Sequence, residues 1–141
     1  MYFSSQRNPG VTFEITGPFR LTQPEATCDG HTITIMGTDG DDEIEGTAGD
    51  DVIAGLGGDD QIAAGPGDDV ICGGTGNDTI DAGSGDDVII SGSNDDTVIA
   101  GSGADEVYGG QGNDLDDGGS GADNLSGGGE SFDSVDAGSG G

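Results

Sequence analysis

Residues 46–81 read GTAGDDVIA, GLGGDDQIA, AGPGDDVIC and GGTGNDTID, four successive units of nine residues. The same register continues on both sides, so that ten unbroken units occupy residues 37–126. A one-residue slip at Gly127 precedes an eleventh unit at 128–136, and residues 137–141 begin a twelfth. A short fixed period is typical of a solenoid, in which each unit buries its apolar side only against its neighbours.

Two positions of the unit carry most of the pattern. Position six is aspartate in every unit, and position eight is Ile, Leu or Val in ten of the eleven. Position four is glycine in nine units and Asn94 in another, and both residue types readily adopt a left-handed backbone. The position-six residues are Asp42, Asp51, Asp60, Asp69, Asp78, Asp87, Asp96, Asp105, Asp114, Asp123 and Asp133.

This pattern predicts an all-β fold. Positions one to six are expected to form a glycine-rich turn, and positions seven to nine a short strand whose position-eight side chain points inward. A strand of three residues is not stable alone, so two units should form one coil, and successive coils should stack about 4.8 Å apart. The expected product is a parallel β-roll, or β-solenoid, with two facing ladders of Ile, Val and Leu as a thin core.

The charge balance excludes several functions. Lys and Arg number 2 and Asp and Glu 29, so the formal net charge is −27. Two cations cannot form a nucleic-acid-binding surface, and no apolar run has the length of a membrane span. Glycine supplies 32 of the 141 residues and apolar residues only 30%, which on its own favours a disordered acidic chain. Such a chain is expected to fold only when divalent cations neutralise it.

The stacked turns offer the oxygen atoms that calcium requires. Ca²⁺ takes about six to eight oxygen ligands from carboxylates and carbonyls, and glycine-rich turns leave their carbonyls uncovered. Turns two units apart should hold one ion between them, pairing Asp42 with Asp60, Asp51 with Asp69, and so on along the chain. The ten regular units allow up to about eight such ions, which would reduce the net charge from −27 to −11.

These units resemble the RTX (repeats-in-toxin) calcium-binding nonapeptide G-G-x-G-x-D-x-U-x, and GGTGNDTID at 73–81 fits each of its fixed positions. The resemblance covers residues 37–136 and implies a right-handed parallel β-roll with Ca²⁺ between stacked turns. It implies that turn glycines and position five contribute only backbone carbonyls. It also implies a secreted bacterial protein, a class that includes proteases, lipases, toxins and adhesins, whose repeats fold outside the cell. The carboxylate ligands that it implies are Asp42, Asp51, Asp60, Asp69, Asp78, Asp87, Asp96, Asp105, Asp114 and Asp123.

The ninth unit departs from the pattern. Its position eight is Asp116, and Leu115 precedes it at position seven. An inward carboxylate in a thin apolar core is unfavourable, so we expect either a bulge that turns Leu115 inward or a frayed row. The sites that use Asp114, Asp123 and Asp133 are therefore expected to be less regular than the earlier ones.

Residues 1–36 form a distinct N-terminal segment with strand candidates at 11–16 and 31–35. Every second unit contributes to one outward face of the roll, and this face is apolar over three coils. Three interpretations of the face are open. Either its β-branched residues are there only because they favour strands, or residues 11–36 fold back and cover it, or a partner or missing domain covers it. The outward residues of that face are Val52, Ala54, Val70, Cys72, Val88, Ile90, Glu106 and Tyr108.

Two cysteines are present, Cys28 in the N-terminal segment and Cys72 on the apolar face. A disulfide between them would hold a cover in place and suits an oxidising, extracellular setting, whereas the alternative is two unrelated thiols. The first residues lack the charged and apolar regions of a signal peptide, so we expect a mature piece or a fragment of a longer protein.

The sequence predicts a non-catalytic protein. His31 is the sole histidine, and the zinc, EF-hand and dinucleotide-binding motifs are missing. The favoured function is a secreted, monomeric, calcium-binding structural module that folds on binding several Ca²⁺ ions, with a possible catalytic or adhesive parent domain. The alternatives are an adhesive or ligand-binding module that uses the apolar face, and the non-catalytic tail of a secreted hydrolase.

Overall fold

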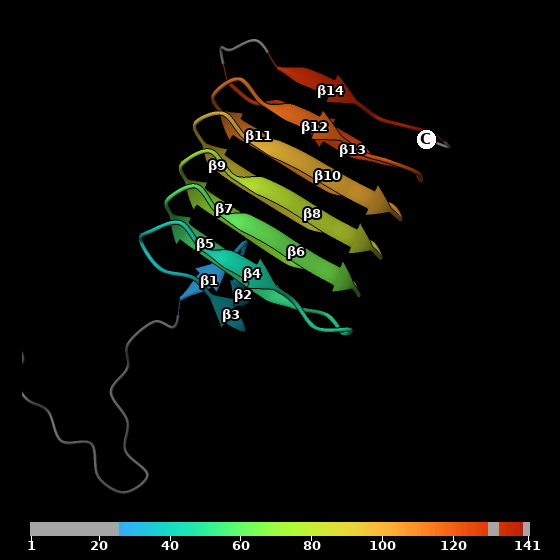
Figure 1. Cartoon of the computed structure of the whole chain (residues 1–141). Helices are drawn as coiled ribbons and strands as arrows, with labels where there is room; N and C mark the ends of the chain where they lie inside the picture. The colour runs from blue at the N-terminus through green and yellow to red at the C-terminus, as the bar shows by residue number, and fades with distance from the viewer. Residues whose placement is uncertain (1–25, 130–132, 140–141) are drawn as a thin grey trace, which may run out of the picture.

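The computed structural model describes residues 26–129 and 133–139, so the strand candidate at 11–16 lies outside the described residues. The described chain folds into two parallel six-stranded sheets and a small antiparallel hairpin (Figure 1). The even sheet contains β4 (Glu43–Glu45), β6 (Gln61–Pro66), β8 (Thr79–Ser84), β10 (Thr97–Ser102), β12 (Leu115–Asp117) and β14 (Ser134–Asp136). The odd sheet contains β3 (Ile35–Met36), β5 (Val52–Gly57), β7 (Val70–Thr75), β9 (Val88–Ser93), β11 (Glu106–Gln111) and β13 (Asn124–Ser126).

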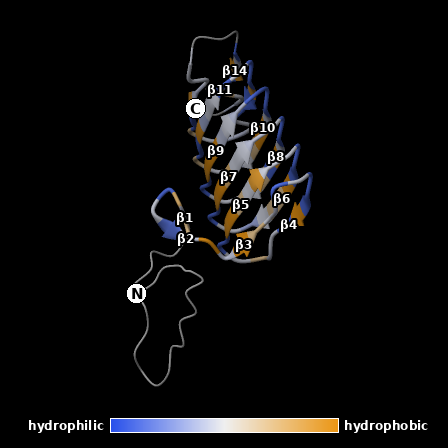
Figure 2. Cartoon of the chain, turned by 90° about the vertical axis from the view of Figure 1, so that its left-hand side faces the viewer, coloured by the Kyte–Doolittle hydropathy of each residue, from blue (hydrophilic) through white to orange (hydrophobic). Residues whose placement is uncertain are grey.

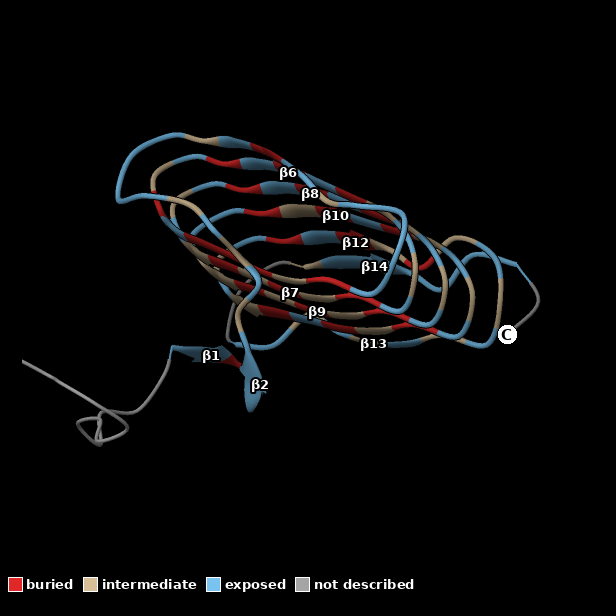
Figure 3. Cartoon of the chain, turned by 90° about the horizontal axis from the view of Figure 1, so that it is seen from below, coloured by how far each residue is buried: buried red, intermediate tan, exposed pale blue. Residues whose placement is uncertain are grey.

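The pairing register confirms that two units form one coil. Ile53 pairs with Ile71, and Ile71 with Ile89, so neighbouring strands of a sheet are eighteen residues apart. The chain alternates between the two sheets at every unit, and the coils stack into a parallel β-solenoid. Viewed from below, the coils lie nearly over one another, with buried residues recurring at matching places (Figure 3).

The core is the thin double ladder that the sequence predicts. The position-eight side chains of Ile53, Ile71, Ile80, Ile89 and Val98 are completely buried between the sheets. Apolar residues recur at corresponding places along successive strands (Figure 2). Position one also faces inward, which the sequence analysis did not anticipate, and its alanines at 64, 82 and 100 are completely buried.

The strands are longer than expected. From β5 to β11 each strand has six residues, covering positions seven to nine and then positions one to three of the next unit. Positions two and three join the ladder mainly through backbone pairing, as Leu56 with Gly74 and Gly57 with Thr75 show. The prediction that positions one to six form a turn was therefore wrong, because only positions four to six turn the chain in these units.

Asp116 also contradicts the expectation. It pairs with Val98 on one side and Val135 on the other, and its side chain is completely buried. Leu115 stays outward and is 48% exposed. The ladder contains no bulge at this row, because backbone pairing on both sides fixes which side chains point inward.

The predicted slip at Gly127 lies further along the chain. Gly127 and Gly128 still stack on Gly109 and Gly110, the residues eighteen positions earlier. The backbone offset becomes nineteen only after Gly129, since Asp133 stacks on Asp114. The offset of the described residues therefore changes from eighteen at Gly128 to nineteen at Asp133.

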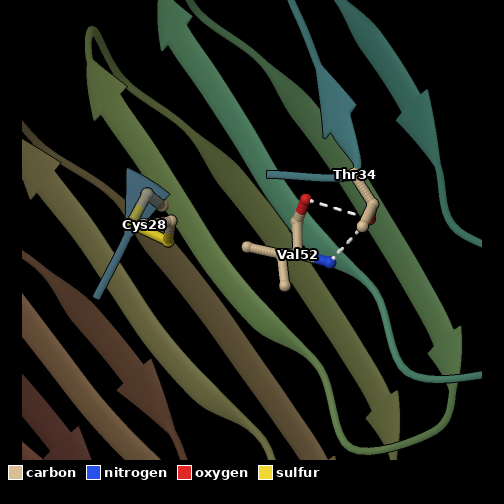
Figure 4. Close-up of a disulfide and its surroundings, with 4 residues drawn as sticks. Cys28, Thr34 and Val52 are labelled. Carbon is tan, nitrogen blue, oxygen red and sulfur yellow. Dashed lines mark hydrogen bonds between the residues drawn. A yellow bond between two sulfur atoms is a disulfide. The ribbon is translucent and has the colours of Figure 1, made fainter. Parts of the chain in front are cut away.

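A hairpin precedes the first strand of the solenoid and lies against the outward face of the odd sheet. The candidate strand at 31–35 is divided: β1 (Thr27–Cys28) and β2 (His31–Thr32) form the hairpin, and Ile35 already pairs with Ile53 in the odd sheet. Between them, Thr34 Oγ accepts a hydrogen bond from the Val52 N–H at 2.9 Å (Figure 4). The solenoid thus begins half a coil before its first glycine-rich unit.

The predicted disulfide between Cys28 and Cys72 is present. It joins β1 to β7, and β1 packs against β5 and β7 on the apolar face of the odd sheet. Ala54 on this face is 4% exposed, whereas Glu43, Gln61 and Thr79 on the even sheet are exposed. The hairpin therefore covers the beginning of the apolar face, as one interpretation of the sequence predicts. In the described part of the chain, no helix is long and apolar enough to cross a membrane.

Candidate metal sites in the stacked turns

The position-six aspartates form one ladder at each end of the coils. The backbone N–H of each donates a hydrogen bond to the Oδ1 atom of the aspartate eighteen residues later, as from Asp60 to Asp78 at 2.9 Å. All eight predicted pairs from Asp42–Asp60 to Asp105–Asp123 stack in this way. The ladder continues from Asp114 to Asp133 at 3.1 Å. The ladder thus continues through the later turns, although its offset there changes from eighteen to nineteen residues.

The second carboxylate oxygen of most of these aspartates is buried and finds no hydrogen-bond donor among the described residues. A buried carboxylate oxygen without a donor is strongly unfavourable, so these atoms are suited to a cation. We call them the open oxygens. They are the Oδ2 atoms of Asp60, Asp69, Asp78, Asp87, Asp96, Asp105, Asp114 and Asp123.

Backbone carbonyls lie close to the open oxygens. On Gly73, a Cβ atom would stand 2.5 Å from Asp78 Oδ2 and 2.5 Å from the carbonyl oxygen of Ser91 in the next coil. Within the described residues, no group of three or more His, Cys, Asp or Glu side chains is arranged to hold a metal. The donor set is therefore carboxylate and carbonyl oxygen, the set that Ca²⁺ prefers over the nitrogen and sulfur ligands of zinc.

Burial also changes the acidity of the aspartates. It raises the pKa of Asp78 and of Asp87 from the ordinary 3.8 to about 7, and that of Asp96 to about 6. The hydrogen bond from the stacked backbone N–H lowers each pKa, but neighbouring carboxylates raise it again. Without a cation, the folded turns therefore hold ionised carboxylates at neutral pH only at an energetic cost.

The first two turns are built differently. Asp42 Oδ2 accepts hydrogen bonds from the backbone N–H and the hydroxyl of Thr38, at 2.5 and 2.9 Å. Asp51 Oδ2 likewise accepts hydrogen bonds from the backbone N–H and the hydroxyl of Thr47, at 2.6 and 3.0 Å. Threonine occupies position two in these two units. Most later units have glycine there, such as Gly74 with a φ of +117°, and glycine has no hydroxyl to donate. Of the ten predicted ligands, Asp42 and Asp51 thus already have donors for both oxygens.

Position five has a role that the sequence analysis missed. The Asp or Asn side chain at position five accepts a hydrogen bond from the backbone N–H of position five in the next coil. Asp59 Oδ1, for example, accepts one from the Asn77 N–H at 2.9 Å. This second ladder runs from Asp41 to Asn113 on alternating ends of the stack. The signal was present, because Asp or Asn occupies position five in eight of the ten regular units.

Asn94 fits its turn as the sequence predicts. It has a φ of +90°, and its Oδ1 atom accepts the N–H of Gly76 at 3.1 Å. Asparagine tolerates this left-handed backbone better than other residues with a side chain. Asparagine in place of glycine at position four therefore does not disturb the stacking of this turn.

The fold and its turns together define a repeat-built β-solenoid whose stacked acidic turns suit a hard divalent cation. The sequence model of the RTX calcium-binding nonapeptide repeat matches the chain in four copies, at residues 36–71, 64–98, 81–116 and 90–125. The four copies span more than half of the chain, which therefore belongs to this family and is a calcium-binding repeat module. No curated protein matches the chain.

Proposed function

We propose that this chain is a structural module that folds when Ca²⁺ fills its stacked turns. The observation that carries the proposal is the row of eight buried open oxygens, and backbone carbonyls lie beside those of Asp60, Asp78 and Asp114. A cation between turns would neutralise these oxygens and remove the cost of burying them. In water containing little calcium, the same row of carboxylates opposes folding.

Up to about eight ions are proposed, one for each pair of position-six aspartates from Asp42–Asp60 to Asp105–Asp123. Stacking of all eight pairs supports this number. Because neighbouring ions share a turn, binding at one site orders part of the next, and binding is expected to be cooperative. The expected affinity is that of extracellular modules, roughly 10⁻⁴–10⁻³ M.

The proposed setting is outside a bacterial cell. RTX repeats typically occur in secreted bacterial proteins, and a disulfide between Cys28 and Cys72 is typical of an oxidising compartment. We propose that the chain itself is not catalytic. What supports this is its composition, since its single histidine, His31, lies exposed on the hairpin.

Small-angle X-ray scattering on the full chain tests the proposal. With a chelator, the radius of gyration should approach the roughly 39 Å expected of an unfolded chain of this length. With millimolar Ca²⁺ it should fall well below that value, and Mg²⁺ should not replace Ca²⁺, because it prefers a smaller shell with retained water. A compact particle of the same size with and without calcium would contradict the proposal.

A ligand-binding role for the apolar face remains the second candidate. The hairpin occupies part of that face and is fixed there by the disulfide, which supports a structural role for β5 and β7. A binding screen with calcium present, comparing the chain with a variant that lacks residues 1–33, distinguishes the two. Binding by the intact chain would favour the ligand-binding role, whereas binding that appears only without the hairpin would show that the hairpin serves to cover this face.

A further inference from the structure

In the ninth unit, residues 109–117, a carboxylate replaces the aliphatic side chain of the inward ladder. Asp116 is completely buried, and neither of its carboxylate oxygens finds a donor in the part of the chain that the structure describes. The side chain cannot turn away, because Val98 and Val135 pair with it on both sides. Such a group is strongly unfavourable unless something neutralises it.

The Asp116 carboxylate points toward a second one. The point at which a Cβ atom would stand on Gly109 lies 2.7 Å from Asp114 Oδ2, 2.9 Å from Asp116 Oδ2 and 2.9 Å from the Gly127 carbonyl oxygen. Asp114 is also buried, and its Oδ2 atom is one of the open oxygens. Three oxygens from two coils therefore converge beside a residue that has no side chain.

The other units show that this place ordinarily holds a methyl group. Beside Gly37 the matching atom is Ile44 Cδ1, at 3.1 Å, and beside Gly118 it is Leu125 Cδ1, at 3.0 Å. Asp116 Oδ2 has taken that position, while the open oxygen and the carbonyl of the regular turn are retained. The ninth unit thus adds a carboxylate to an arrangement that supplies one elsewhere.

We propose that Asp114 and Asp116 together bind one Ca²⁺ ion inside the roll, with the Gly127 carbonyl as a further ligand. The inference rests on the proposed calcium-dependent function but goes beyond the repeat pattern, in which position eight is aliphatic. Affinity for calcium rises with the number of carboxylate ligands, so this site, which has one carboxylate more than a regular site, should fill before the regular sites. It would fix the C-terminal coils around the row of Val98, Asp116 and Val135.

Equilibrium dialysis of the calcium-stripped full chain against radiolabelled Ca²⁺ at neutral pH tests the proposal. The variants are Asp116→Ile, which restores the aliphatic residue of the other units, and Asp116→Asn. The matched control is Asp81→Asn, which removes one charge from an exposed position of the even sheet. Circular dichroism at saturating calcium verifies that each variant is folded.

The wild-type chain should bind one ion at least about tenfold more tightly than the rest. Both Asp116 variants should lose this step and keep the weaker ones, and Asp81→Asn should keep all of them. Binding by Asp116→Ile that equals the wild type would overturn the inference alone. Absence of calcium binding in the wild type would instead overturn the proposed function, and the inference with it.

Discussion

Each regular turn treats the two oxygens of its aspartate differently. In Asp78, Oδ1 accepts the N–H of Asp60 at 2.9 Å, which keeps adjacent coils in register, while Oδ2 is an open oxygen. The first oxygen therefore stabilises the stack with or without a metal. The second destabilises the folded chain until a cation reaches it, so a single residue type supplies both the stacking and the calcium dependence.

Replacing Asp78 with asparagine tests this division. The amide retains an oxygen for the stacking hydrogen bond but removes the charge that a cation would bind. We expect the calcium concentration at the folding midpoint to rise about tenfold, which corresponds to roughly 1.4 kcal/mol. Titration followed by circular dichroism measures it, with Asp81→Asn as the control for net charge. Equal midpoints for the two variants would show that Asp78 is not a ligand.

The raised pKa values of Asp78, Asp87 and Asp96 predict a pH dependence for the calcium-free chain. The folded chain holds protons on these carboxylates that the unfolded chain has released, so its stability decreases as pH rises from about 4 to about 7. Calcium-stripped protein should therefore show more β structure at pH 5 than at pH 8. Calcium-saturated protein should show the opposite trend, because protons compete with the ion. A calcium-free spectrum that does not change with pH would refute this assignment.

At the scale of the strand and turn, glycine permits the close stacking of coils. Gly85 has a φ of +132°, and a Cβ atom on it would collide with the carbonyl oxygen of Gly67 in the preceding coil. Gly40, at the same position of the first unit, would meet only Thr38 Oγ at 3.9 Å. Glycine at position four is thus required in the turn of Gly85 and dispensable in the turn of Gly40.

We therefore expect Gly85→Ala to destabilise the calcium-bound chain by at least about 2 kcal/mol, from backbone strain and collision together. Gly40→Ala should change stability by less than about 0.5 kcal/mol. Urea unfolding in millimolar Ca²⁺ measures both variants. Similar losses in the two would mean that the first turn and the inner turns of the stack are built alike.

Much of this fold could be predicted from the sequence, because a nine-residue period with one aliphatic position leaves few ways to form a core. Strand length could not, since positions such as Leu56 and Gly74 pair only through their backbones and leave no side-chain pattern. The inward Asp116 was missed for a related reason: residue preference opposes it, and pairing on both sides outweighs that preference.

The candidate site was predictable in part. Position six and its partner two units away follow directly from the repeat. The donors from Thr38 and Thr47 were not anticipated, although threonine at position two marks these units in the sequence. Which of two chemically identical oxygens lacks a donor depends on the packing of two coils, and a single unit does not contain that information.

For the molecule as a whole, the two ends of the stack differ. At the N-terminal end, Thr38 and Thr47 supply donors that the later turns lack, and the hairpin is joined to β7 through Cys28 and Cys72. At the C-terminal end, the coils contain the buried Asp116 and the extra residue before Asp133. The two ends therefore depend on different groups: the N-terminal coils on the threonine donors and the disulfide, and the C-terminal coils on whatever neutralises Asp116.

Removal of the disulfide tests the contribution of the hairpin. The bridge spans 44 residues of sequence, and closing a loop of that size in the unfolded chain stabilises the folded one by about 4 kcal/mol in the chain-entropy model. The double variant Cys28→Ser, Cys72→Ser should lose about that much in urea unfolding with calcium present. If its stability equalled that of the wild type, the bridge would contribute nothing to the stability of the stack.

The most direct measurement is a far-UV circular dichroism titration of the calcium-stripped chain with Ca²⁺, with Mg²⁺ as the control. The open oxygens predict a disordered spectrum at neutral pH that converts cooperatively to β structure with Ca²⁺ and not with Mg²⁺. A full β spectrum that persists in chelator would contradict this account. The core and the Cys28–Cys72 bridge would then suffice for the fold, and the function would have to be sought on the apolar face.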